Sequence, residues 1–285
     1  MKKILAVSGG VDSMLLLWRF RNDKDAVVAH FNHGTRPSAD ADAELVRKKV
    51  AEYGLEFFYK KVELGEGVSE AEARKARYDF LSDVLEQVNA RADTTSEVKI
   101  FTAHHLNDLA ETIAINLLRG TGWRGLAPFS DARVERPFIT EKMTKNDIIV
   151  EAAKNGIVFR QDPTNVEENY LRNRLRKNVA EMGKDELLKI YDLYEKQARI
   201  RQKAETIINS VVAEIPTQYP RGFFQSLDDD VALEILRGVV AKYGISLTRP
   251  QLKDFLTAVR EYLPGKKFNL PGDRMVEIRK NWFSL

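Results

Sequence analysis

Residues 8–13, Ser-Gly-Gly-Val-Asp-Ser, have the composition of an anion-binding loop. An apolar run at residues 4–7 precedes them and another at residues 14–18 follows, which predicts a buried strand, a glycine turn and the start of a helix. Glycine permits backbone conformations that a Cβ forbids and lets an anion approach the main-chain N–H groups. A helix N-terminus adds unpaired N–H groups and a partial positive charge, so this stretch is predicted to bind phosphate.

The loop differs from the common phosphate-binding motifs. A Walker A loop needs a Gly-Lys-Ser/Thr end, and no lysine follows here. Residues 8–13 instead resemble the Ser-Gly-Gly-x-Asp-Ser pyrophosphate loop of the N-type ATP pyrophosphatases. That resemblance implies cleavage of ATP to AMP and pyrophosphate, with adenylation of a carbonyl-type oxygen.

The four histidines of the chain fall in only two segments, His30 with His33 and His104 with His105. Each segment follows a predicted strand, and core histidines scattered through a fold would not cluster in this way. We expect the edge formed by residues 30–32 to bind adenine through backbone N–H and C=O groups. The alternative is a plain strand end capped by Asn32.

Asp108 and Glu111 are spaced i, i+3 at the start of a predicted helix, so their carboxylates share one helical face. Beside an imidazole they can hold Mg²⁺ on a pyrophosphate or bind an ammonium group. The alternative is a solvated acidic first turn that the helix dipole favours.

Alternating strands and helices must position these groups. Such alternation predicts βαβ units, a mostly parallel Rossmann-like α/β sheet, and a ligand at the carboxyl ends of its strands. The predicted strands are 4–7, 26–29, 56–62, 99–103 and a short one at Val134; the predicted helices are 40–53, 69–88, 106–119 and 144–155.

Helical periodicity dominates the rest of the chain, over 184–212, 229–243 and 248–260, before short strands in 266–285. The sequence therefore predicts a catalytic domain at 1–184 and a smaller, mainly helical domain at 185–285.

Composition excludes several chemistries. The 285 residues include no cysteine, which rules out disulfides, thiolate nucleophiles, Cys-based zinc sites and iron–sulfur clusters. No apolar run reaches membrane-spanning length, and the N-terminus has no leader character, so we expect a cytoplasmic protein without a membrane partner. The oligomeric state is left open.

Basic residues cluster in two places, although the 45 Lys and Arg nearly balance the 42 Asp and Glu. Such clusters suit the phosphate backbone of a nucleic acid, and the alternative for each is a salt-bridged surface. The first is Arg172-Asn173-Arg174-Leu175-Arg176-Lys177, and the second comprises Arg260, Lys266, Lys267, Arg274, Arg279 and Lys280.

With these segments in view, residues 1–180 resemble the tRNA(Ile)-lysidine synthases. The matching segments, in family order, are 30–36, 70–78, 102–112, 117–126, Arg136-Pro137, and 162–176. The chain departs from the family pattern at Asn107, where the pattern has Asp, and at Leu109, where it has Gln.

This resemblance implies a two-step reaction with ATP and Mg²⁺. The C2 oxygen of the wobble cytidine of tRNA(Ile) with a CAU anticodon attacks the α-phosphate, and the amine of free L-lysine then displaces AMP to give lysidine. His33, His104 and His105 are the candidates to accept the lysine proton, and the sequence does not choose among them.

The resemblance also implies a role for each matching residue. The expected catalytic residues are Asp12, His33, His104, His105, Asp108 and Glu111. ATP is expected at Ser8, Gly9, Gly10, Val11, Asp12, Ser13, His30, Phe31 and Asn32, Mg²⁺ at Asp12 and Asp108, and lysine at Asp108 and Glu111. Transfer RNA is expected at Arg36, Arg74, Arg77, Arg119, Arg172, Asn173, Arg174 and Arg176.

Other enzyme families with this loop explain fewer features of the sequence. Sulfur-inserting tRNA enzymes need cysteines, which the chain lacks. An ammonia-dependent NAD synthetase fits the length but explains neither the arginine-rich segment nor the C-terminal helices. A catalytically inactive nucleotide- or RNA-binding homologue has Asn107 as its only support.

Overall fold

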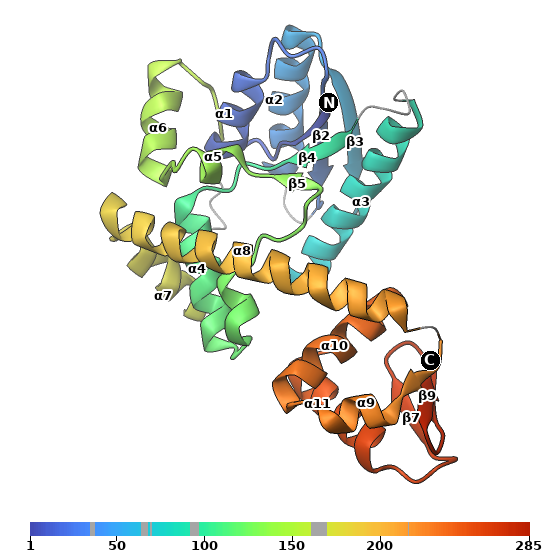
Figure 1. Cartoon of the computed structure of the whole chain (residues 1–285). Helices are drawn as coiled ribbons and strands as arrows, with labels where there is room; N and C mark the ends of the chain where they lie inside the picture. Colours follow the sequence, from blue (N-terminus) through green and yellow to red (C-terminus); the bar gives the residue numbers. More distant parts are fainter. Residues whose placement is uncertain (35–37, 64–67, 69, 92–96, 161–169, 216) are drawn as a thin grey trace. The chain divides into compact units, whose positions relative to one another are not determined.

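The computed structural model describes residues 1–34, 38–63, 68, 70–91, 97–160, 170–215 and 217–285 (Figure 1). These residues form two compact units, Met1–Glu195 and Lys196–Leu285. The division falls inside one long helix, α8 (Lys184–Glu214), whereas the boundary predicted from the sequence stands at the start of that helix.

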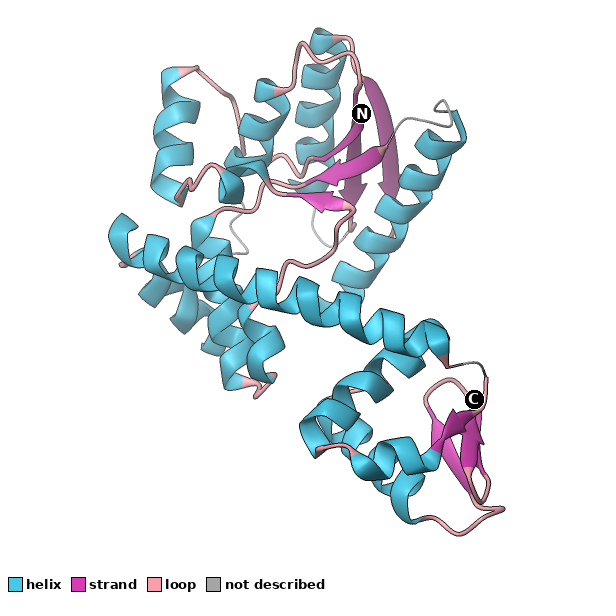
Figure 2. Cartoon of the chain, in the orientation of Figure 1, coloured by secondary structure: helices cyan, strands magenta, loops and turns pink. Residues whose placement is uncertain are grey.

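A five-stranded parallel sheet organises the first unit, as Figure 2 shows. Its strand order is β3-β2-β1-β4-β5, with β1 at the centre. The strands are β1 (Lys2–Ala6), β2 (Ala26–Asn32), β3 (Glu56–Lys61), β4 (Val98–Phe101) and β5 (Val134–Glu135). The parallel Rossmann-like sheet predicted from the sequence is therefore confirmed.

Helices cover both faces of this sheet because the central strands are apolar on both sides. On one face, Ile4 of β1 packs with Phe80 and Val84 of α3 (Glu70–Arg91). On the other face, Leu5 lies in a cluster to which α1 (Val11–Arg19), α2 (Ser38–Tyr53) and α6 (Lys145–Lys154) contribute.

A third group of helices extends from the carboxyl edge of the sheet. α4 (Leu106–Leu118) begins just after β4, and Leu109 is fully buried against Val179 of α7 (Tyr170–Ala180) and Leu187 of α8. Two short elements lie where the sequence predicted only loop or a strand end, the 3₁₀ helix η1 (Gly122–Leu126) and α5 (Pro137–Thr140).

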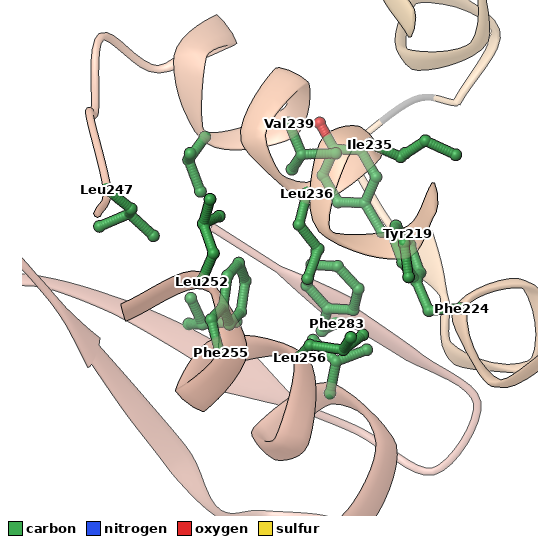
Figure 3. Close-up of a cluster of buried hydrophobic side chains, with 14 of the residues drawn as sticks. Tyr219, Phe224, Ile235, Leu236, Val239, Leu247, Leu252, Phe255, Leu256 and Phe283 are labelled. Atoms are coloured by element: carbon green, nitrogen blue, oxygen red, sulfur yellow. The ribbon is translucent and has the colours of Figure 1, made fainter. Parts of the chain in front are cut away.

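The second unit combines helices with a four-stranded antiparallel sheet. Its core contains Tyr219, Phe224, Leu236, Phe255 and Phe283, which point toward one another in Figure 3. The strand order is β6 (Tyr219–Pro220), β9 (Trp282–Ser284), β8 (Arg274–Ile278) and β7 (Lys267–Leu270), and the helices are α9 (Arg221–Ser226), α10 (Asp229–Lys242) and α11 (Arg249–Glu261). Among the helices described, none is long and apolar enough to cross a membrane.

Candidate functional site

The loop between β1 and α1 is held in shape by the hydroxyl of Ser13. This oxygen accepts hydrogen bonds from the N–H groups of Ser8 (3.1 Å) and Gly9 (3.2 Å), and it donates to the carbonyl of Gly10 (3.0 Å). Gly9 has a φ of +97°, and a Cβ on it would lie 3.3 Å from the Cβ of Asp42. Only glycine therefore fits this position without strain.

The N-terminus of α1 is open to an anion. Gly10 is its N-cap, and among the described residues no side chain caps this end of the helix. The N–H groups of the first turn of an α-helix have no partner within the helix. The loop and the first turn of α1 therefore offer backbone N–H groups that suit a phosphate chain, as binding of ATP at this loop would require.

Asp12, in the first turn of α1, is paired with a lysine that lies 133 positions further along the chain. The Nζ of Lys145 lies 2.7 Å and 2.8 Å from the two carboxylate oxygens of Asp12. Lys145 is the first residue of α6, and both side chains remain partly exposed, at 39% and 30%. Sequence reasoning missed Lys145, because the pairing depends on how α6 packs beside α1.

His105 lies between two of the predicted carboxylates. Its Nε2 is 3.8 Å from Asp12 Oδ1 and 3.4 Å from Asp108 Oδ2, and its side chain is only 7% exposed. The backbone N–H of His105 also donates to Asp108 (2.9 Å), which fixes the start of α4. The structure therefore brings together the loop after β1 and the segment after β4, as their places at the strand ends predicted.

Glu111 lies one turn further along α4 and is 12% exposed. Burial raises the pKa of Glu111, and the charge of Asp108 raises it further. The Nε of Arg176 in α7 lies 3.6 Å from this carboxylate. Arg176, predicted to contact RNA, is thus placed beside one of the two predicted lysine-binding acids.

His104 is surrounded by aromatic and cationic groups. Its Nδ1 is 2.8 Å from the hydroxyl of Thr102, and its ring lies 5.3 Å from that of Phe129. Burial, together with the charges of Arg136, Arg77 and Arg74, lowers the pKa of His104 to about 4. The ring is therefore neutral at physiological pH.

Three arginines belong to this surrounding. Arg74 and Arg77 extend from α3 and both contact the ring of Tyr78, at 4.9 Å and 5.6 Å. Arg136 stacks over Phe129 at 4.4 Å, and burial lowers the pKa of both Arg77 and Arg136. Arg136 was part of a matched motif in the sequence, but its place near His104 was not predicted.

The side chains at the end of β2 have structural partners. His30 is buried, its Nδ1 donates to the carbonyl of Val7 (2.7 Å), and burial lowers its pKa. Asn32 donates to Asp40 (2.8 Å) and accepts from the N–H of Gly34 (2.9 Å). Both side chains thus shape the edge where the sequence predicts adenine, and any contact with adenine falls to the backbone or to the rings of Phe31 and His33, which meet at 4.7 Å.

The other predicted RNA contacts are spread more widely. Arg119 is exposed at the C-cap of α4, and Arg174 is exposed on α7. Arg36 lies outside the described residues, and the side chains of Arg172 and Asn173 are not described. In the second basic cluster, Arg260 donates to the carbonyls of Phe224 (3.0 Å) and Leu227 (2.6 Å), so this arginine holds the second unit together.

Asn107 has a role that its departure from the family pattern did not reveal. Its Oδ1 accepts from the backbone N–H of Lys145 (2.9 Å), and its Nδ2 donates to the carbonyl of Val179 (3.4 Å). One amide thus bridges α4, α6 and α7, and a carboxylate could make only the first of these contacts.

The acids suit a magnesium ion that is shared with phosphates. Among the residues that the structure describes, no group of three His, Asp or Glu side chains gathers closely enough to hold a metal. Mg²⁺ is typically bound by one or two carboxylates, with phosphate oxygens and waters as its other ligands. Asp12 and Asp108, which flank His105, meet that requirement together with a nucleotide.

A parallel α/β sheet with a glycine-rich phosphate loop at its carboxyl edge defines the class as a Rossmann-like phosphate-binding domain. Residues 1–182 match the PP-loop domain family, and the chain belongs to that family.

Three relatives are tRNA(Ile)-lysidine synthases. The chain is 27% identical over 275 residues to that of Staphylococcus epidermidis, covering 87% of this chain and 62% of the relative. For Thermus thermophilus the identity is 31% over 285 residues, covering 94% and 54%. For Thermotoga maritima it is 35% over 196 residues, covering 64% and 45%. The chain thus spans about half to three fifths of the length of these relatives.

The fold is also shared with a solved structure, the U34-tRNA thiolase NcsA from Methanococcus maripaludis with its [4Fe-4S] cluster. The TM-score is 0.52 at 15% identity, covering 70% of this chain and 72% of that one. The likeness concerns the fold, since the present chain has no cysteine to bind such a cluster.

Proposed function

We propose that this protein is an ATP-dependent ligase that joins free L-lysine to C2 of the wobble cytidine, position 34, of tRNA(Ile) with a CAU anticodon. The observation that carries the proposal is the position of His105 between Asp12 of the loop and Asp108 of α4. His105 thus lies between a loop that suits phosphate and a pair of acids, Asp108 and Glu111, that suit an ammonium group. The relatives named tRNA(Ile)-lysidine synthase support the same reading.

In the first step the C2 oxygen of the cytidine attacks the α-phosphorus of ATP. The bond from that phosphorus to the bridging oxygen breaks, pyrophosphate leaves, and the cytidine is adenylated. The loop and the N-terminus of α1 hold the phosphates, which is catalysis by positioning and electrostatics. Mg²⁺ held by Asp12 and Asp108 would neutralise phosphate charge during this step.

In the second step the amine of lysine attacks C2, and the bond from C2 to the AMP oxygen breaks. Asp108 and Glu111 bind a lysine ammonium, and the attacking amine must lose a proton. His104 is a poor acceptor for that proton because its pKa is about 4. His33 and His105 therefore remain the candidates for the general base.

RNA must approach the same edge of the sheet. Arg74 and Arg77 on α3, whose charges reach His104, and the exposed Arg174 on α7 supply positive charge for phosphates, and the cytidine must leave its stack to reach the loop. The other members of the predicted contact set, as the family resemblance implies, are Arg36, Arg119, Arg172, Asn173 and Arg176.

The test is incubation of the purified protein with a tRNA(Ile) CAU transcript, ATP, Mg²⁺ and labelled lysine. We expect ATP-dependent incorporation of lysine into the transcript and none into a transcript with U at position 34. ATP binding without incorporation would favour an inactive homologue. ATP–pyrophosphate exchange that depends on nicotinate adenine dinucleotide would favour an NAD synthetase.

A further inference from the structure

Lys145 lies beside the loop that suits a phosphate chain, and its ammonium group is paired with Asp12 of that loop. Its Nζ contacts both carboxylate oxygens of Asp12, at 2.7 Å and 2.8 Å. Asp12 also lies at the open N-terminus of α1, next to the N–H groups that suit phosphate. The ammonium group of Lys145 is therefore within a side chain's length of the anion site.

The backbone of Lys145 is fixed while its side chain is not enclosed. Thr144 caps α6 by accepting from the N–H of Asp147 (3.2 Å), and Asn107 accepts from the N–H of Lys145 (2.9 Å). The Lys145 side chain is 39% exposed, and four methylene groups separate its ammonium from this anchored backbone. The ammonium can therefore change partners without any movement of α6.

The charges at the loop explain why a change of partner is needed. The loop supplies N–H groups with only partial charges, and a phosphate chain carries several full ones. Asp12 adds a negative charge that repels phosphate unless a cation neutralises it. An ion pair between side chains this exposed adds little to stability, so stability alone is a weak reason for the contact.

We propose that Lys145 binds a phosphate oxygen of the nucleotide, and that Asp12 holds its ammonium in the nucleotide-free protein. On binding, Asp12 exchanges the ammonium for the divalent cation that accompanies the phosphates, and Lys145 turns to phosphate. Asp12 and Lys145 each keep a partner of opposite charge before and after the exchange. This inference rests on the proposed function, because it assumes that the loop binds the pyrophosphate portion of ATP.

The test is a double-mutant cycle on the full chain, with binding of inorganic pyrophosphate measured by calorimetry in the presence of EDTA. Asp12→Asn releases Lys145 and removes a repelling charge, so it should tighten binding by about tenfold. In the Asp12→Asn background, Lys145→Met should weaken binding by about tenfold or more, since the phosphate loses its ammonium partner.

Lys184→Met is the matched control, because Lys184 of α8 pairs at 2.8 Å with Asp147 of α6, the helix that also carries Lys145. It should change pyrophosphate binding by less than about twofold. Thermal melting of each variant, measured alongside, establishes that the compared proteins are folded.

The inference is wrong if the double variant, Asp12→Asn with Lys145→Met, binds pyrophosphate as tightly as the single variant Asp12→Asn. Lys145 would then only neutralise Asp12. Absence of pyrophosphate binding in every variant would also overturn it. The assay contains neither tRNA nor lysine, so a protein that fails to form lysidine but shows the expected cycle would contradict the proposed function and leave this inference standing.

Discussion

The side-chain oxygen of Asn107 accepts a hydrogen bond from the backbone N–H of Lys145 at 2.9 Å, which ties the start of α4 to the start of α6. The same amide donates to Val179 of α7. A position that departs from the family pattern is thus a bridge between three helices that surround the site. We expect this bridge to contribute to stability, and its variants separate that role from catalysis.

Asn107→Ala should lower the free energy of unfolding by about 1–2 kcal/mol, because it leaves two backbone groups without their partner. Asn107→Asp should cost less, since a carboxylate still accepts from Lys145 and is favoured at the N-terminus of α6. Denaturant unfolding measures both. A larger loss for Asp than for Ala would contradict this account of the amide.

His104 should make stability depend on pH in the acid range. Its pKa is about 4 in the folded protein and 6.5 as the ordinary value, so between these values the unfolded chain binds a proton that the folded protein does not. The free energy of unfolding is therefore not reduced by this proton above about pH 6.5, and it decreases as the pH falls from there toward about 4.

The measurement compares wild type with His104→Asn, whose amide can still contact Thr102. Between about pH 7 and pH 4.5 the wild type should lose about 2 kcal/mol more of its free energy of unfolding than the variant does. Parallel pH profiles of the two proteins would show that His104 is not the cause.

Glu111 should control affinity for lysine. Glu111→Gln removes a charge that binds ammonium and should raise the KM for lysine by about tenfold, with the KM for ATP little changed. An ordinary glutamate has a pKa of about 4.3, and burial and the charge of Asp108 raise the pKa of Glu111. On acidification, the wild-type KM for lysine should therefore begin to rise at a higher pH than protonation of an ordinary glutamate would produce. Steady-state kinetics over a pH series checks both, and an unchanged lysine KM in Glu111→Gln would exclude this role.

Arg174 should contribute to RNA binding through phosphate alone. Arg174→Ala should weaken tRNA binding severalfold and lower the slope of log affinity against log salt by about one. Arg133→Ala is the control, since Arg133 is already paired with Asp131 at 2.9 Å. Filter binding at several salt concentrations provides the data. Equal effects of the two substitutions would argue against a specific contact at Arg174.

Much of the first unit could be predicted because its signals are local. The apolar runs at residues 4–7 and 26–29 gave the central strands, and alternation with helices gave a parallel sheet with the loop at its edge. The position of Asp108 and Glu111 on one helix followed from their i, i+3 spacing. These features depend on periodicity and on the rule that ligands bind at strand ends.

The remainder depends on tertiary contacts that no spacing encodes. Lys145 meets Asp12 across 133 positions of sequence separation, and Asn107 meets Lys145 only because α4 and α6 start side by side. The segment around Pro220, which lies between two predicted helices and for which no element was predicted, contains β6 and α9. Buried Arg221 fixes it by donating to the carbonyls of Val259 (2.6 Å) and Tyr262 (2.9 Å).

Transfer of label from [α-³²P]ATP to the tRNA(Ile) CAU transcript, with lysine omitted, tests the central claim most directly. The wild type should label the transcript only when position 34 is cytidine, and added lysine should release the label as AMP. Asp12→Ala should reduce labelling by about a hundredfold or more, while Asp25→Ala, at the opposite end of the sheet, should leave it unchanged. Absence of label with the wild type, or full labelling with Asp12→Ala, would contradict adenylation of the cytidine at this loop.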